Sequence, residues 1–145
     1  MFVIRGIGRY EEGLAALDKA QALNPTAIHY LVQAEIIQRQ TGDFKAALAS
    51  GEKIIAIEPS NPEGYVIAAR ALIGLKDLKG AEAAFLKVTR MEPGYADGWV
   101  NVGRARLTEG NLAGAEEVLR RALAVRAGIA PDGLALDVDP GLPVA

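Results

Sequence analysis

A repeating interval of 34 residues constrains the fold of this chain more than any other feature of its sequence. Three prolines, Pro25, Pro59 and Pro93, stand 34 residues apart, and columns of similar residues keep the same interval. These columns include Gly8, Gly42 and Gly110; Gly13, Ala47, Ala81 and Ala115; Leu31, Tyr65 and Trp99; and Ala20, Ile54, Val88 and Ala122. A period in this range indicates a solenoid, because one small unit cannot bury its apolar face alone and stacked units supply the core.

Each period has the pattern of two amphipathic helices joined by a short turn. In residues 27–60, apolar side chains recur at spacings of three and four, which draws one buried stripe on each of two helices. Gly42 can take the positive φ that ends a helix, Asp43 can cap the next one, and Asn61 followed by Pro62 marks another start. The sequence predicts an all-α chain with helices near residues 9–23, 27–40, 43–57, 62–74, 77–91, 96–109 and 111–126.

The charge and the residue types exclude several classes of protein. The 145 residues carry a formal net charge of -2, which argues against a dedicated nucleic-acid binder. With no cysteine there is no disulfide framework and no thiolate metal site. No apolar run approaches the length of a membrane span, so we expect no membrane insertion. A cytoplasmic location is expected, with the periplasm as the alternative.

Several residues match the consensus of a known repeat. Trp99 and Gly103 fit W-x2-L-G-x2-Y, Ala81 and Phe85 fit A-x3-F, and the proline column supplies the last element. On these residues the chain resembles the tetratricopeptide repeat family over about residues 8–127. The resemblance implies an α-solenoid of about three and a half helix-turn-helix repeats, wound as a right-handed superhelix.

Four positions depart from the consensus of that family. Lys76 replaces the turn glycine, Gly51 a large apolar residue, Arg106 a tyrosine and Ala127 the fourth proline. These departures are spread over three repeats and each affects a different column, so no single column is lost.

The chain divides into a repeat array and a tail. We expect an array at 1–127, made of a half repeat at 1–26 and repeats at 27–60, 61–94 and 95–127. An acidic segment rich in proline and glycine follows at 128–145. It is interpreted as a linker or mobile end, as a lid over its own last helix, or as a segment that enters a neighbouring molecule.

Residues that could carry out catalysis are sparse. His29 is the one histidine, and no thiol or second imidazole accompanies it. The adjacent carboxylates Glu11-Glu12 and Glu116-Glu117 point about 100° apart on a helix, which does not suit acid–base chemistry. We therefore expect no enzymatic activity, no cofactor and no metal site.

The better candidate for function is the first helix of each pair, which lines the concave face in the family that the chain resembles. The resemblance places nine residues there: Val32, Ile36, Arg39, Val66, Arg70, Ile73, Val100, Arg104 and Leu107. An apolar strip edged by arginines suits an extended peptide that alternates apolar and acidic side chains. In the alternative interpretation the valines pack between adjacent helices and the arginines pair with Glu63 or Asp97.

A column of cations lies near the ends of the second helices, at Lys19, Lys53, Lys87 and Arg121. Positive charge near a helix C-terminus interacts favourably with the helix dipole, by about 0.3–1 kcal/mol. We interpret this column as helix-stabilising rather than as a basic docking surface.

Three functions fit these features. We favour a non-enzymatic scaffold for protein–protein interaction, which binds an acidic and apolar peptide or a partner surface on its concave face. The first alternative is self-assembly into a homo-oligomer through the tail or through array ends that expose apolar surface. The second alternative is an accessory segment of a larger enzyme.

Overall fold

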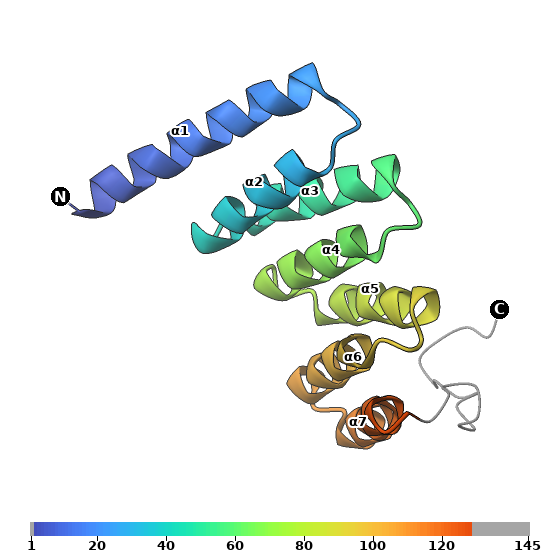
Figure 1. The fold of residues 1–145 in the computed structure, drawn as a ribbon. Helices are drawn as coiled ribbons and strands as arrows, with labels where there is room; N and C mark the ends of the chain where they lie inside the picture. Colours follow the sequence, from blue (N-terminus) through green and yellow to red (C-terminus); the bar gives the residue numbers. More distant parts are fainter. Residues whose placement is uncertain (1, 129–145) are drawn as a thin grey trace. The chain divides into compact units, whose positions relative to one another are not determined.

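The computed structural model describes residues 2–128, with side chains from Gly8 onward. It contains seven helices and no strand over that range (Figure 1). The helices are α1 (Phe2–Leu23), α2 (His29–Gln40), α3 (Phe44–Ile57), α4 (Pro62–Gly74), α5 (Leu78–Met91), α6 (Ala96–Glu109) and α7 (Leu112–Arg126). The prediction of an all-α chain is confirmed, and α2 to α7 begin and end within two residues of the predicted bounds. The predicted tail lies outside the described residues, apart from Gly128.

The first helix is longer than the sequence predicted. We expected it to start near residue 9, but α1 begins at Phe2. The later start followed from the 34-residue interval, because Gly8 aligns with the turn glycines Gly42 and Gly110. Glycine in a helix interior also costs about 1 kcal/mol relative to alanine. Extending a helix that already exists needs no new nucleation, so the preceding residues join α1 despite Gly6 and Gly8.

The turns inside the helix pairs use the predicted caps. Gly42 has a φ of 79°, and the Asp43 carboxylate accepts a hydrogen bond from the backbone N–H of Ala46 at 3.2 Å. Gly110 has a φ of 83°, and Asn111 caps α7 in the same way. The left-handed residue ends one helix, and the side chain after it satisfies a free N–H of the next.

The third turn of this kind lacks a glycine. Lys76 adopts a φ of 64°, a conformation that costs a residue with a Cβ about 1–2 kcal/mol. The cap that follows is intact, because the Asp77 carboxylate accepts from the backbone N–H of Gly80 at 3.0 Å. Between repeats, Asn61 caps α4 and Pro62 occupies its first turn, as predicted.

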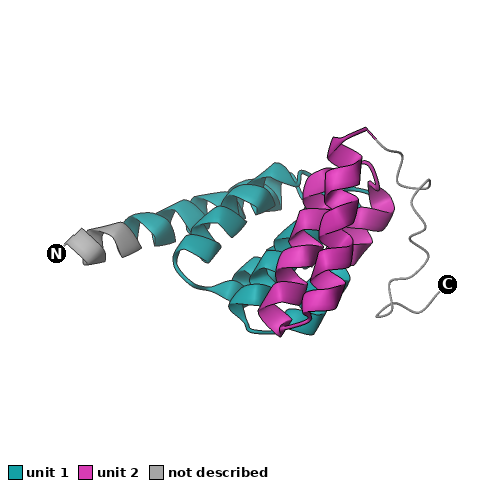
Figure 2. Ribbon diagram, turned by 90° about the horizontal axis from the view of Figure 1, so that it is seen from below, with its two compact units in different colours: residues 1–84 teal, residues 85–145 magenta. Residues whose placement is uncertain are grey.

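The chain divides into two compact units, Met1–Ala84 and Phe85–Ala145, with the boundary inside α5 (Figure 2). In the first unit α1 packs on α2, α2 on α3, and α3 on α4. In the second unit α6 packs on α7. Within each unit these successive helices are therefore neighbours in space, as a helix-turn-helix repeat requires.

The core of the first unit joins three successive helices. Leu31 of α2, Ile54 of α3 and Ile67 of α4 are buried together, and the partly buried Val32 packs against them. One helix pair thus leaves an apolar groove that the first helix of the next repeat closes.

The helices α3 and α4 approach each other through glycines. A Cβ added to Gly51 would lie 2.9 Å from the backbone nitrogen of Ala68, and one added to Gly64 would lie 3.0 Å from that of Ile55. Real Cβ atoms do not pack this closely against backbone, so both positions require glycine at this separation. This contact accounts for the departure from the family pattern at Gly51.

The second unit buries its own apolar stripe and one charged residue. Val102 of α6 and Ala115 and Val118 of α7 are almost completely buried. Arg106, which stands where the family has a tyrosine, is also buried, and its Nη1 donates to the backbone carbonyl of Gly114 at 3.2 Å. In the column that begins with Gly13, the residues Ala47, Ala81 and Ala115 are all almost completely buried.

Candidate functional site

An exposed arginine precedes an exposed aliphatic side chain by three residues in each unit. On α4 the pair is Arg70 and Ile73, the latter 41% exposed. On α6 the pair is Arg104 and Leu107, the latter 48% exposed. Residues three apart share one face of a helix, so each unit presents a cation beside an apolar side chain.

The two arginines have no acidic partner among residues 8–128. The predicted alternative paired them with Glu63 or Asp97, but Asp97 accepts instead from Nη2 of Arg126 at 3.2 Å. No ion pair of Arg70 or Arg104 occurs in this part of the chain. Their guanidinium groups are thus available to a ligand.

The remaining predicted site residues are less available. Val32 packs against the core of the first unit, as the structural alternative held for the valines. Arg39 is engaged by the buried Glu35, with 2.9 Å between Nε and Oε1. Ile36, Val66 and Val100 are half-buried. Partner binding by these residues stays a prediction.

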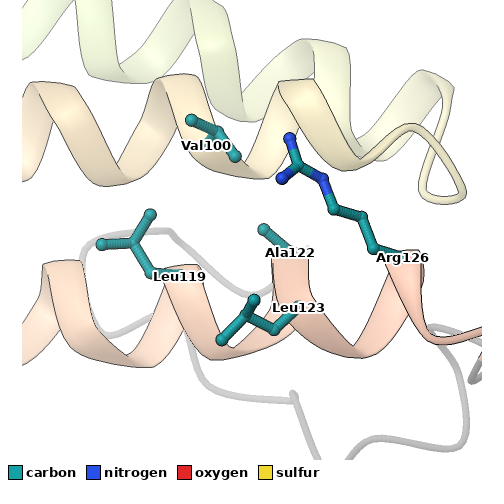
Figure 3. Close-up of a pocket in the computed structure, with 5 residues that line it drawn as sticks. All are labelled: Val100, Leu119, Ala122, Leu123 and Arg126. Carbon is teal, nitrogen blue, oxygen red and sulfur yellow. The ribbon is translucent and has the colours of Figure 1, made fainter.

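A hollow lies between α6 and α7 in the second unit (Figure 3). Its volume is about 230 Å³, and its lining consists of Val100, Leu119, Ala122, Leu123 and Arg126. Figure 3 shows Val100 projecting from α6 and the long side chain of Arg126 reaching from α7 towards α6. The surface is apolar except for this one guanidinium.

Of these lining residues, only Val100 is among the predicted site residues. The 34-residue interval could have identified the others, because Leu119, Ala122 and Leu123 stand two periods after Gly51, Ile54 and Ile55. Their equivalents in the first unit meet α4. The hollow is therefore the repeat's normal groove for a following helix.

The predicted cation column contains one residue of a different kind. Lys19, Lys53 and Lys87 are exposed, whereas Arg121 is buried. The Arg121 guanidinium lies over Trp99, 5.1 Å from the ring centroid. A planar guanidinium stacks well on an indole, so this residue joins α7 to α6 rather than acting on the helix dipole alone.

The described residues hold no group of three or more His, Asp or Glu side chains that could bind a metal ion. His29 is exposed, and its ring lies 3.9 Å from that of Tyr30 between centroids. From Phe2 to Gly128, no helix is long and apolar enough to cross a membrane.

Known proteins of similar sequence and structure agree with this geometry. One tetratricopeptide repeat model matches residues 5–62 and 68–133, and a second matches 38–97. A search of the curated proteins finds none with significant similarity.

Among solved structures, MamA 41-end from Desulfovibrio magneticus RS-1 superposes with a TM-score of 0.74 at 17% identity, over 88% of this chain and 72% of that one. A thermophilic TPR protein in Thermus thermophilus gives 0.68 at 24% identity, over 87% and 71%. The predicted resemblance and fold class are confirmed. The chain belongs to the tetratricopeptide repeat family and folds as an all-α solenoid of helix-turn-helix repeats.

Proposed function

We propose that this chain is a protein-interaction scaffold in which each compact unit binds an extended segment of a partner protein, the first unit on the exposed face of α4 and the second on the exposed face of α6. Membership of a family of interaction repeats supports the general role. The observation that carries the specific proposal is the repeated pair of exposed arginine and exposed aliphatic residue, Arg70 with Ile73 and Arg104 with Leu107.

The chemistry of each pair selects the ligand. Arginine binds a carboxylate through two parallel N–H donors, and an aliphatic neighbour on the same face covers an apolar side chain. In an extended peptide successive side chains point to opposite sides, so a peptide that lies between the two residues presents its acidic side chains to the arginine and its apolar side chains to the aliphatic residue. Ile36 and Val66 in the first unit, and Val100 in the second, add half-buried apolar surface on the same helices or their neighbours.

The expected affinity is modest. An exposed ion pair contributes about 0.2–1 kcal/mol, so no single arginine determines binding. Two such pairs with their apolar contacts are consistent with a dissociation constant of about 1 µM, which corresponds to roughly -8 kcal/mol.

The test measures binding of labelled peptides that alternate leucine with aspartate, using fluorescence anisotropy. Arg70→Glu combined with Arg104→Glu should weaken binding strongly while the helical circular dichroism stays unchanged. The matched control is Lys19→Glu with Lys53→Glu, which makes the same change in charge at two exposed positions. Equal loss in both double variants, or no loss in the arginine variant, contradicts the proposal.

The single variants measure how much each unit contributes to peptide binding. Arg70→Glu reports on α4 and Arg104→Glu on α6, so a partner that uses only one unit is recognised directly. A peptide that alternates leucine with lysine serves as the ligand control, since it has the same apolar side chains and the opposite charge.

Self-assembly is the second candidate, because α7 exposes two large apolar side chains. Leu112 is 69% exposed and Leu123 is 66% exposed. Analytical ultracentrifugation over a range of concentrations tests this candidate. A mass that stays at that of one chain at every concentration argues against it.

A further inference from the structure

A buried carboxylate on α2 is not explained by packing alone. Glu35 is 2% exposed, and within residues 8–128 its recorded partner is Arg39, whose side chain is 41% exposed. Removing a carboxylate from water is costly, and an ion pair with a partly exposed arginine offsets little of that cost. Stability therefore does not account for a glutamate at this position.

The other repeats hold small residues at the position of Glu35. Ala69 and Gly103 stand one and two periods later, and both are buried. At Gly103 an added Cβ would lie 2.6 Å from Cδ2 of Leu119, so the second unit has no room for a larger side chain. The position equivalent to Leu119 is Gly51, so no leucine side chain opposes Glu35. The first unit thus accommodates a side chain that the second unit excludes.

The contact between Glu35 and Arg39 fixes how the arginine is presented. Oε1 of Glu35 accepts a hydrogen bond from Nε of Arg39 at 2.9 Å. A guanidinium has five N–H donors, and Nε carries one of them. The terminal Nη1 and Nη2 groups of Arg39 make no hydrogen bond or ion pair with the described side chains from Gly8 onward. Their outer edge can bind a carboxylate through two parallel hydrogen bonds. Arg39 is therefore oriented while this edge stays free.

Arg39 also shares a helix face with an aliphatic side chain. Ile36 lies three residues before Arg39 on α2 and is half-buried. This pair combines a cation with an apolar side chain, as Arg70 and Ile73 do on α4, in the opposite order along the helix. Both helices belong to the first unit and pack on α3. A ligand on α4 can therefore extend onto α2.

We propose that Glu35 is a positioning residue for Arg39, and that Ile36 and Arg39 bind an acidic and apolar part of the extended segment that contacts α4. This inference rests on the function proposed above and adds a second carboxylate contact in the first unit. Fixing the arginine before the ligand arrives lowers the side-chain entropy that binding costs. The second unit has no equivalent contact, because Leu107 stands at the position of Arg39.

The test of Arg39 uses the anisotropy assay with the peptide that alternates leucine with aspartate. Arg39→Gln should weaken binding about fivefold, which is the upper end for an exposed ion pair. A second peptide that alternates leucine with asparagine has no carboxylate, so the parent and Arg39→Gln should bind it equally. An equal loss of affinity for both peptides overturns carboxylate binding by Arg39.

The direction of the change at Glu35 tests the positioning role. Glu35→Ala should weaken binding of the aspartate peptide about threefold, because Arg39 loses its fixed orientation. If Glu35 only neutralised Arg39, removing its charge would strengthen binding, and that result overturns the positioning role. Glu35→Gln keeps an oxygen that accepts from Nε, so it should bind at least as tightly as the parent. In an Arg39→Gln background, Glu35→Ala should have no further effect on affinity.

The matched control is a second Glu–Arg pair of the same spacing. On α7, Oε1 of Glu116 lies 2.6 Å from Nη2 of Arg120, and both side chains are largely exposed. Glu116→Ala removes the same charge as Glu35→Ala and should leave the affinity unchanged. A loss equal to that of Glu35→Ala means that the effect is one of net charge and overturns the positioning role.

Two further measurements separate the possible failures. Circular dichroism checks the fold of each variant, and if Glu35→Ala loses its helices, the response of Arg39→Gln to the two peptides still tests the carboxylate contact. Arg70→Glu is measured in the same assay. Weaker binding by Arg70→Glu with no change in Arg39→Gln overturns this inference alone. Unchanged binding in both variants contradicts the proposed function as well.

Discussion

The groove between α2 and α3 is closed by a helix, whereas the equivalent groove between α6 and α7 is left open by the described residues. Both grooves arise from the same 34-residue interval, so the repeat determines where a groove forms. The residues that follow each pair determine what fills it. Asn61 and Pro62 start a new helix after α3, whereas Gly128 and a proline-rich segment follow α7.

The largest effect is expected from glycines that occupy the same place in the two units. Gly64 is the third residue of α4, and Gly98 is the third residue of α6. A Cβ on Gly64 would lie 3.0 Å from the backbone nitrogen of Ile55, whereas one on Gly98 would meet its nearest atom at 3.5 Å. Gly64→Ala should therefore destabilise the protein by about 1–3 kcal/mol in urea denaturation.

Gly98→Ala is the matched control. Its new methyl group meets only ordinary van der Waals contacts, and alanine restricts the unfolded chain, so stability should rise by about 0.4–1 kcal/mol. If both variants lose the same stability, the close approach of α3 and α4 does not explain why Gly64 and Gly98 should respond differently to alanine.

The next effect concerns the cation column. Arg121 is buried over Trp99, while Lys53, two periods earlier, is exposed. Arg121→Ala should cost about 1–2 kcal/mol through the lost stacking on the indole. Lys53→Ala should stay within about 0.5 kcal/mol of the parent. Thermal melting of both variants distinguishes them, and a similar melting temperature would show that the stacking contributes little.

A smaller gain is expected at the strained turn. Lys76 adopts the left-handed conformation that Gly42 and Gly110 adopt in the other two turns. Lys76→Gly should stabilise the chain by about 0.5–1 kcal/mol, because the strain removed exceeds the backbone entropy that glycine adds to the unfolded state. The reciprocal change, Gly110→Lys, should destabilise it by a similar amount. A loss of stability in Lys76→Gly means that the lysine side chain makes a contact worth more than the strain.

The smallest effect is expected from the ion pair beside the hollow. Asp97 and Arg126 are 59% and 60% exposed, so a double-mutant cycle with Asp97→Asn and Arg126→Gln should give about 0.2–1 kcal/mol. The coupling should fall in 1 M salt, where the screening length shortens to about 3 Å. A larger coupling that resists salt contradicts this account of a solvated pair.

The sequence predicts the helices well because their ends depend on local chemistry. Gly42 with Asp43, and Asn61 with Pro62, lie within a few residues of the helix ends that they determine. Gly51 and Arg121 depend instead on residues of another helix, Ala68 and Trp99, so their roles do not follow from spacing alone. The site was predicted in part for the same reason. The helix face of Arg70 follows from periodicity, whereas the pairing of Asp97 with Arg126 depends on how α6 and α7 pack.

The buried Arg106 also fixes the alignment of its helix pair. Its guanidinium is almost inaccessible to water and donates to the carbonyl of Gly114 across the α6–α7 contact. If α7 slid by one residue along α6, a charge would be stranded in apolar surroundings, which costs several kcal/mol. Aliphatic contacts alone tolerate such sliding far better. The arginine therefore selects one register for this hairpin. We expect the two helices to separate as one unit rather than slide along each other.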